Sequence, residues 1–335
     1  MRKGFWYIFI LICSIRQELQ AQVCSDPGLC TIGSLNSATS ADTVSTTDYT
    51  KADLEELLNV SIYGERYNIS TEAGISFGDE GTSIYSLNLR GSLRLKEKLS
   101  LGVKLPFIST QGVLGKVFGL GDLTINLQNI FKSGKSIRMA YTLGVVIPTN
   151  SGNTKFAGAP LPMVYQTSMG FFGALAGLTI STRKWNFVFG SQQNFGRNRN
   201  EFITNYLVLD PLLPGYDPLN SERKKFASSR KIHNGLDVMF RVERTVSIKK
   251  FVIALGVLPI YRVNNSTIQL QDESVFELSK SNGLTFNLTG GVSYKINKLW
   301  QMTANGGFPI INRENAPDGL RRMSVFLFRF NRLFW

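Results

Sequence analysis

The segment Tyr85-Ser-Leu-Asn-Leu-Arg-Gly-Ser-Leu-Arg-Leu95 decides the fold class of this chain. Its odd-numbered positions carry Tyr, Leu, Leu, Gly, Leu and Leu, whereas its even-numbered positions carry Ser, Asn, Arg, Ser and Arg. A period of two residues is typical of a β-strand with one apolar and one polar face. The run is also longer than the strands of most soluble sheets and suits a tilted crossing of a bilayer.

The same alternation recurs along the chain, which suggests many strands of one kind. It is clear in residues 99–107, 123–131, 137–147, 232–242 and 284–296, and less regular near 59–69, 164–182, 185–195, 248–263, 299–308 and 322–335. The 31 Gly, 23 Phe and 11 Tyr residues also favour strands and turns over helices. We therefore predict an all-β fold, a transmembrane antiparallel β-barrel of about twelve strands.

The segments between the predicted strands alternate in length. Short polar turns are expected at 96–98, 132–135, 183–184, 244–247 and 297–298, and longer loops at 70–82, 109–119, 148–163, 196–229, 264–280 and 309–320. Outer-membrane barrels have short periplasmic turns and long extracellular loops, so this pattern predicts the cell outer membrane. Trp185, Trp300 and Trp335 all fall at the predicted turn end, as expected of an aromatic belt.

The N-terminus has the pattern of an export signal. Arg2 and Lys3 precede an apolar run, Phe5 to Cys13, that is too short to span a bilayer as a helix, so residues 1–22 are predicted to be a signal peptide. Residues 23–58 form a predicted periplasmic or plug segment with a short helix at its end, and residues 59–335 form the barrel. Cys24 and Cys30 flank an Asp-Pro-Gly turn, which favours a disulfide; a redox or copper-handling role is the alternative.

The polar face of these strands predicts the lining of the barrel. The lumen-lining candidates are Arg90, Arg94, Lys104, Asp122, Arg138, His233, Asp237, Arg241, Glu243 and Lys295. Such a lining could attract anionic solutes, or it could be a salt-bridge network that fills a narrow barrel.

The longest predicted loop, residues 196–229, is a candidate constriction. The residues that would form it are Arg197, Arg199, Phe202, Tyr206 and Tyr216. Alternatively, the loop caps the barrel outside, with its basic residues on lipopolysaccharide phosphates. Loops of this length are commonly functional.

The chain ends in an apolar segment that fits a closing strand. Phe326, Phe328, Phe330 and Phe334 share one parity and can face lipid, while Arg329 lies on the opposite face. We expect this strand to pair with the first one near Val60 and to end in a signal for the barrel-assembly machinery.

Residues Gly119-Leu-Gly-Asp-Leu-Thr-Ile-Asn-Leu-Gln-Asn-Ile-Phe131 resemble the "GLGD" strand of a family of Gram-negative outer-membrane barrels. That family is grouped with transporter-like and meta-pathway phenol-degradation proteins, and is distantly like fatty-acid channels. Residues 99–107 and Gly144-Val-Val-Ile-Pro-Thr149 are similar to its other strand ends, although Asn150 replaces the usual Gly. The resemblance implies uptake of small, often apolar or aromatic solutes.

These patterns together predict a channel or transporter for small solutes. A closed structural barrel that binds lipopolysaccharide or a partner protein is the alternative, and a barrel hydrolase using His233, the only histidine, is a weaker one. We expect no catalytic residues, metal site or cofactor. Nucleic acid is not an expected partner, because the Lys and Arg residues are dispersed. The expected partners are outer-membrane lipid, lipopolysaccharide, the barrel-assembly machinery and the solute.

Overall fold

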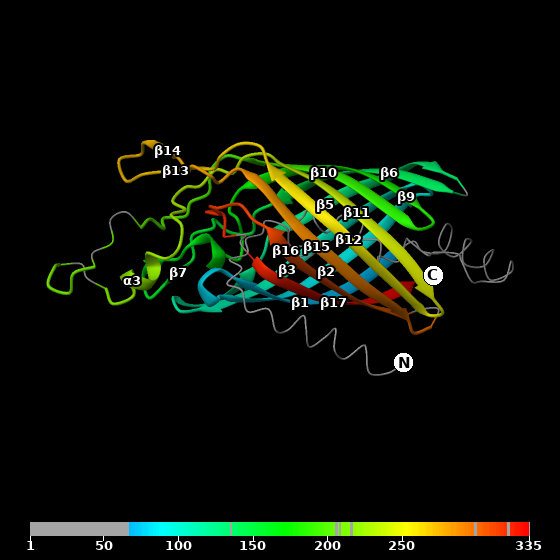
Figure 1. Cartoon of the computed structure of the whole chain (residues 1–335), viewed down its shortest axis with the longest axis horizontal. Coiled ribbons are helices and arrows are strands. Elements are labelled where there is room, and N and C mark those ends of the chain that lie inside the picture. Colours follow the sequence, from blue (N-terminus) through cyan, green and yellow to red (C-terminus); the bar gives the residue numbers. More distant parts are fainter. Residues whose placement is uncertain are drawn as a thin grey trace.

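The computed structural model describes residues 67–134, 136–204, 207, 209–214, 217–297, 300–319 and 322–334 (Figure 1). The predicted signal peptide, segment 23–58, Cys24, Cys30, Tyr206, Tyr216 and Trp335 lie outside the described residues. The long strands are β1 (Tyr67–Gly78), β2 (Ser83–Lys96), β3 (Leu99–Gly112), β5 (Leu123–Ser133), β6 (Ile137–Ile147), β9 (Phe172–Thr182), β10 (Trp185–Phe195), β11 (Asp237–Ile248), β12 (Phe251–Arg262), β15 (Gly283–Lys295), β16 (Trp300–Ile311) and β17 (Arg322–Phe334).

Shorter elements lie between these strands or extend them. They are β4 (Gly115–Leu120), β7 (Lys155–Phe156), β8 (Ala159–Pro160), β13 (Thr267–Gln269), β14 (Val275–Glu277), the 3₁₀ turns η1 (Asp79–Gly81) and η2 (Met163–Tyr165), and the helical turn α3 (Asn220–Arg223). No helix in the described part of the chain is long and apolar enough to span a membrane.

The twelve long strands form a closed antiparallel barrel, as predicted. Neighbours in sequence are neighbours in the sheet, and β17 pairs with β1 to close it. Closure pairs every strand on both sides, so the barrel has no open edge.

The outer surface of the barrel is apolar, because the alternation along each strand places the apolar side chains on the outward face. Leu255 is 67% exposed and Phe328 is 61% exposed, whereas their chain neighbours Ala254 and Leu327 are buried. Exposed Leu, Val, Ile and Phe side chains occur on the outward face of most strands. A closed barrel with this outer surface belongs in lipid, which places the chain in the cell outer membrane.

The two ends of the barrel differ, as the lengths of the connections predicted. Five hairpin turns lie at one end, and the long loops lie at the other end, on the left in Figure 1. The loops cover residues 148–171, 196–236, 263–282 and 312–321, so the longest one extends beyond its predicted end at residue 229. The turn end is periplasmic and the loop end is extracellular.

The first strand was predicted in the wrong place. β1 covers Tyr67–Gly78, so the predicted loop 70–82 is wrong and only residues 79–82 connect β1 to β2. The closing strand therefore pairs with Tyr67–Gly78, and not near Val60. The cause is the weak side-chain contrast of β1, whose outward face includes Thr71 and Ala73.

Other boundaries also differ from prediction. The expected loop 109–119 is a hairpin, because β3 runs to Gly112 and β4 pairs back onto it. β9 begins at Phe172 rather than at residue 164, β11 begins at Asp237 rather than at residue 232, and β11 continues through the predicted turn 244–247 to Ile248. At the starts of β9 and β11, the preceding loop residues are apolar because they are buried against other loops. Their apolar side chains therefore extend the apparent strand pattern.

Candidate functional site

One carboxylate, Glu72, forms the centre of an ion cluster on the inner wall. Its strand neighbours in register are Arg329 on β17 and Asn88 on β2. Arg90 donates from Nη2 to Glu72 Oε1 at 2.8 Å, and Arg329 donates from Nε to Oε2 at 2.8 Å. Asn88 Nδ2 donates to Oε1 at 3.2 Å. The Glu72 cluster thus joins β17, β1 and β2, the seam where the barrel closes.

The inner wall of the strands carries more cationic than acidic side chains. Arg90 lies opposite Lys104 in the β2–β3 register, so another cation is next to the Glu72 cluster. Among the described strand residues whose parity points inward, the cations are Arg90, Arg94, Lys104, Arg138, Arg241, Arg262, Lys295 and Arg329, and the acids are Glu72, Asp237 and Glu243.

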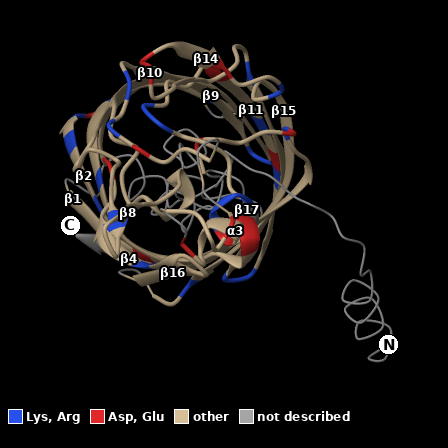
Figure 2. Cartoon of the chain, turned by 90° about the vertical axis from the view of Figure 1, so that its left-hand side faces the viewer, with Lys and Arg blue, Asp and Glu red and all other residues tan. Residues whose placement is uncertain are grey.

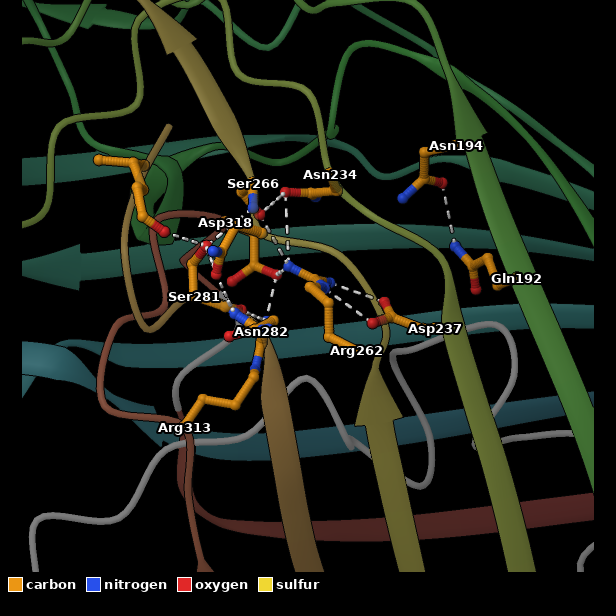
Figure 3. Close-up of polar contacts among 12 residues, drawn as sticks. Gln192, Asn194, Asn234, Asp237, Arg262, Ser266, Ser281, Asn282, Arg313 and Asp318 are labelled. Atoms are coloured by element: carbon orange, nitrogen blue, oxygen red, sulfur yellow. Dashed lines mark hydrogen bonds and ion pairs between the residues drawn. The ribbon is translucent and has the colours of Figure 1, made fainter. Parts of the chain in front are cut away.

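A second buried network lies at the extracellular ends of β11 and β12 (Figure 3). Arg262 donates from Nε and Nη2 to both oxygens of Asp237, at 2.7 and 2.6 Å. Its Nη1 donates to Asp318 Oδ2 at 2.6 Å, and Arg313 Nη2 reaches the same oxygen at 3.3 Å. Arg262 and Asp318 are 1% and 0% exposed. We call these four residues the Arg262 network.

The Arg262 network fixes two extracellular loops to the barrel wall. Arg313 and Asp318 come from the loop after β16, and Arg262 Nη1 also donates to Ser266 Oγ at 3.3 Å in the loop after β12. Arg313 Nη1 donates to the Ser281 carbonyl at 2.9 Å, at the far end of that loop.

Facing the Glu72 cluster across the barrel is an apolar inner patch. It consists of Val188 on β10, Met239 on β11, and Leu258 and Ile260 on β12. In the strand order, β10 and β11 lie half a turn of the barrel away from β1 and β2, and β12 is the next strand after β11. The wall opposite the Glu72 cluster therefore includes an apolar inner patch, next to the charged side chains Asp237, Arg241 and Arg262 of the same strands.

The extracellular loops extend over the barrel mouth as a cap (Figure 2), and their apolar side chains pack into two clusters. One apolar cluster joins the barrel wall, the β3–β4 hairpin and two long loops: Ile84, Leu114, Val117, Leu161, Val164, Tyr165, Phe202 and Phe226. A second one joins three loops: Met163, Phe171, Ile232, Ile268 and Leu278. Tyr165 is central, because its ring packs edge-on against Phe226 and its hydroxyl accepts a hydrogen bond from the Leu114 N–H at 3.1 Å.

Buried amides and one glycine hold the loops of the cap together. Asn200 Nδ2 donates to the carbonyls of Gly152 at 2.9 Å and Leu161 at 3.1 Å. Asn198 Nδ2 donates to the Met169 carbonyl at 3.1 Å. Gly319 has φ of 67°, and a β-carbon there would lie 2.1 Å from the Val164 nitrogen, so only glycine permits this approach.

Asp122 anchors the loop 148–171 at the rim. It lies between β4 and β5 and accepts hydrogen bonds from the Ser168 hydroxyl and, at 3.0 Å, from the Met169 N–H. Withdrawal from water raises the pKa of Asp122 to about 6, although both hydrogen bonds act to lower it.

We expect the attachment of this loop to weaken as pH rises. Because the pKa of Asp122 is raised from 3.8 to about 6, the contribution of this carboxyl to stability is fully present below pH 3.8 and lost as pH rises through 6. The free energy of unfolding of the wild type, minus that of Asp122→Asn, should fall by up to about 3 kcal/mol between pH 4 and pH 7. Equal pH profiles for the two proteins would contradict this.

The residues predicted for the longest loop have different environments. Phe202 is buried in the cap, and Arg197 donates from Nη2 to Thr267 Oγ1 at 2.8 Å and from Nη1 to the Lys231 carbonyl at 2.9 Å. Arg199 is exposed. The base of the loop thus belongs to the cap, and α3 lies beyond the ends of the barrel strands (Figure 1), with Leu219 and Phe226 on either side of it packed into the first apolar cluster.

His233 does not lie on a lumen-lining strand, so that prediction is wrong. It precedes β11, forms an isolated bridge with Thr267, and its Nδ1 is 2.7 Å from the Gly196 carbonyl oxygen. Asp237 does lie on the inner wall, in the Arg262 network, and Glu243 accepts from Asn186 Nδ2 at 3.4 Å. Trp185 and Trp300 lie at the turn ends of β10 and β16, on the outward face.

Sequence reasoning missed Glu72, Arg262, Arg313, Asp318 and the two cap asparagines. The alternation does indicate that Glu72 faces inward, because it has the opposite parity to the apolar residues Ile69, Ala73, Ile75 and Phe77. Arg262 also follows Leu258 and Ile260 on one face of its strand. The other residues lie in loops without periodicity.

The fold and wall chemistry define a class: a closed, membrane-spanning outer-membrane β-barrel with a charged inner wall. Among solved structures, the chain resembles an outer-membrane channel from Pseudomonas putida F1, with a TM-score of 0.57 and 14% identity over 81% of this chain and 96% of that one. The NanC porin and the KdgM porin give TM-scores of 0.41 and 0.42, at 10% identity over 80% of this chain and 99% of each of theirs. No protein-family model matches, and no curated protein matches.

The described residues contain no group of three or more His, Cys, Asp or Glu side chains arranged to hold a metal ion.

Proposed function

We propose that the chain is an outer-membrane channel for small solutes and not an enzyme. The observation that carries the proposal is the composition of the inner wall, where cationic side chains outnumber acidic ones on the described strands. A core that only had to pack would favour matched charges, because burying an unbalanced charge is costly. A water-filled path for anions tolerates and uses such an excess.

The cations near Glu72 and the apolar inner patch support a solute with an anionic group and an apolar part. The anionic group would meet the cations Arg90, Lys104 and Arg329. The apolar part would lie along Val188 and Leu258 in the apolar inner patch. No residue is assigned a catalytic role.

The loop cap is the proposed gate of this channel. Its apolar clusters consist of buried side chains contributed by several loops, so loss of one large side chain should loosen the loops. Phe202→Ala removes a ring that is 2% exposed, a change that typically costs about 3–5 kcal/mol in a well-packed core.

We therefore expect Phe202→Ala to increase the conductance or open time of the purified protein in planar bilayers, relative to wild type. Leu212→Ala is the matched control, because Leu212 lies in the same long loop but is 90% exposed. It should leave conductance unchanged. If wild type and Phe202→Ala conducted equally, the proposal that the cap is a gate would be rejected, but the proposal of a channel would stand.

A closed structural barrel remains the competing proposal, and the Arg262 network favours it because buried ion pairs fix the loops over the mouth. In that case neither wild type nor Phe202→Ala would conduct. That result would reject the channel.

A further inference from the structure

The periplasmic turn end of the barrel carries a ring of basic side chains. Within the described turns, Glu97 is the only acidic residue. The exposed cations of the ring are Lys96, Lys98, Lys132, Arg183, Lys184, Lys249 and Lys250, with Arg244 close by on β11. We call these eight side chains the basic ring.

The basic ring differs from the opposite end in its ion pairing. At the loop end, several exposed cations pair with acids, as in Lys155 with Glu201 and Lys280 with Glu314. Among the described residues, no carboxylate forms an ion pair with a member of the basic ring. These basic side chains are exposed, so an anionic partner outside the chain can approach them.

Two neighbouring hairpins concentrate this charge beside an aromatic side chain. The Thr245 N–H donates to the Lys184 carbonyl at 2.7 Å, which ties the β9–β10 turn to β11. Trp185 is paired with Arg244, whose guanidinium carbon lies 5.6 Å from the centre of the Trp185 ring. Tryptophan at a barrel end marks the depth of the lipid headgroups.

An apolar strip continues from these hairpins along the outward face. Trp185 stacks with Phe187 at 6.2 Å, and Phe189 stacks with Phe240 at 4.5 Å between ring centres. Val246 and Ile248 are exposed on the same face. Cationic groups at the membrane edge, followed by apolar rings, match a phosphate headgroup followed by acyl chains.

We propose that the turn end is a binding surface for anionic glycerophospholipids of the periplasmic leaflet. The preferred headgroup position lies between the β9–β10 and β11–β12 turns, at Arg183, Lys184, Arg244 and Lys249. The acyl chains lie on the outward rings of β10 and β11. This proposal does not depend on whether the barrel conducts.

The test compares lipid binding by the full chain purified in dodecyl maltoside micelles. Bound phosphatidylglycerol and phosphatidylethanolamine are counted by native mass spectrometry during titration. Each basic residue near an anionic surface contributes roughly fivefold to binding, so the triple variant Lys184→Gln/Lys249→Gln/Lys250→Gln should bind phosphatidylglycerol at least about tenfold more weakly. Its binding of phosphatidylethanolamine should be unchanged.

The matched control is Lys116→Gln/Arg199→Gln/Lys224→Gln, which removes three exposed cations from the loop end. It should bind phosphatidylglycerol like wild type. All six side chains are exposed, so both variants should keep the heat-modifiable electrophoretic mobility of a folded barrel. Wild-type binding by the turn-end variant, or an equal loss in the loop-end control, would overturn the proposal.

Discussion

Replacing Glu72 with Gln should lower the free energy of unfolding by about 3–5 kcal/mol. The carboxylate is 0% exposed and accepts hydrogen bonds from Arg90 and Arg329. Gln keeps the shape but not the charge, so two guanidinium groups would remain close together without the anion between them. Because the cluster joins β17 to β1 and β2, the lost stability is that of the strand pairing that closes the barrel. Urea unfolding in micelles, followed by tryptophan fluorescence, measures the change.

Glu314→Gln is the matched control for this prediction. Glu314 pairs with Lys280, and both side chains are mostly exposed, so the expected change is below about 1 kcal/mol. The double variant Glu72→Gln/Arg329→Gln should regain part of the lost stability, because it also removes one cation. If Glu72→Gln unfolded at the same urea concentration as Glu314→Gln, the cluster would have no role in closure.

Replacing Arg262 with Met should release two loops of the cap and destabilise the barrel by about 3–5 kcal/mol. Asp237 and Asp318 would both remain buried without their shared cation. Met has a long side chain that preserves packing, so the effect reports the charge. We expect faster cleavage by protease within residues 263–282 and 312–319, and a higher conductance if the barrel is a channel.

Lys155→Met is the control, because Lys155 pairs with Glu201 between two loops of the same cap but both side chains are about half exposed. It should leave protease sensitivity unchanged. If Arg262→Met failed to assemble, Asp318→Asn would test the same network with a smaller change, because its amide oxygen can still accept from Arg262. Protease resistance equal to wild type in both variants would show that the network does not hold the cap.

The strands that sequence placed best are those whose two faces meet different surroundings. The predicted ranges 137–147 and 185–195 are the bounds of β6 and β10. Their outward residues face lipid and their inward residues face mostly polar neighbours. The polarity of each side chain therefore indicates the face on which it lies. Prediction failed at β1, where outward Thr and Ala weaken the difference in polarity between the two faces. It also failed at β11, where buried apolar loop residues extend the alternation beyond the strand.

The sequence by itself determined the closed barrel, its apolar outer surface, the difference between its two ends and the parity of the charged residues on its strands. All of these follow from local alternation and from the spacing of turns. Only the tertiary structure decided which charges meet. Arg262 contacts Asp237 and Asp318 at sequence separations of 25 and 56, and Glu72 contacts Arg329 at a separation of 257. These contacts depend on the register between distant strands and on the packing of four loops. Neither of these produces a periodic pattern in the sequence.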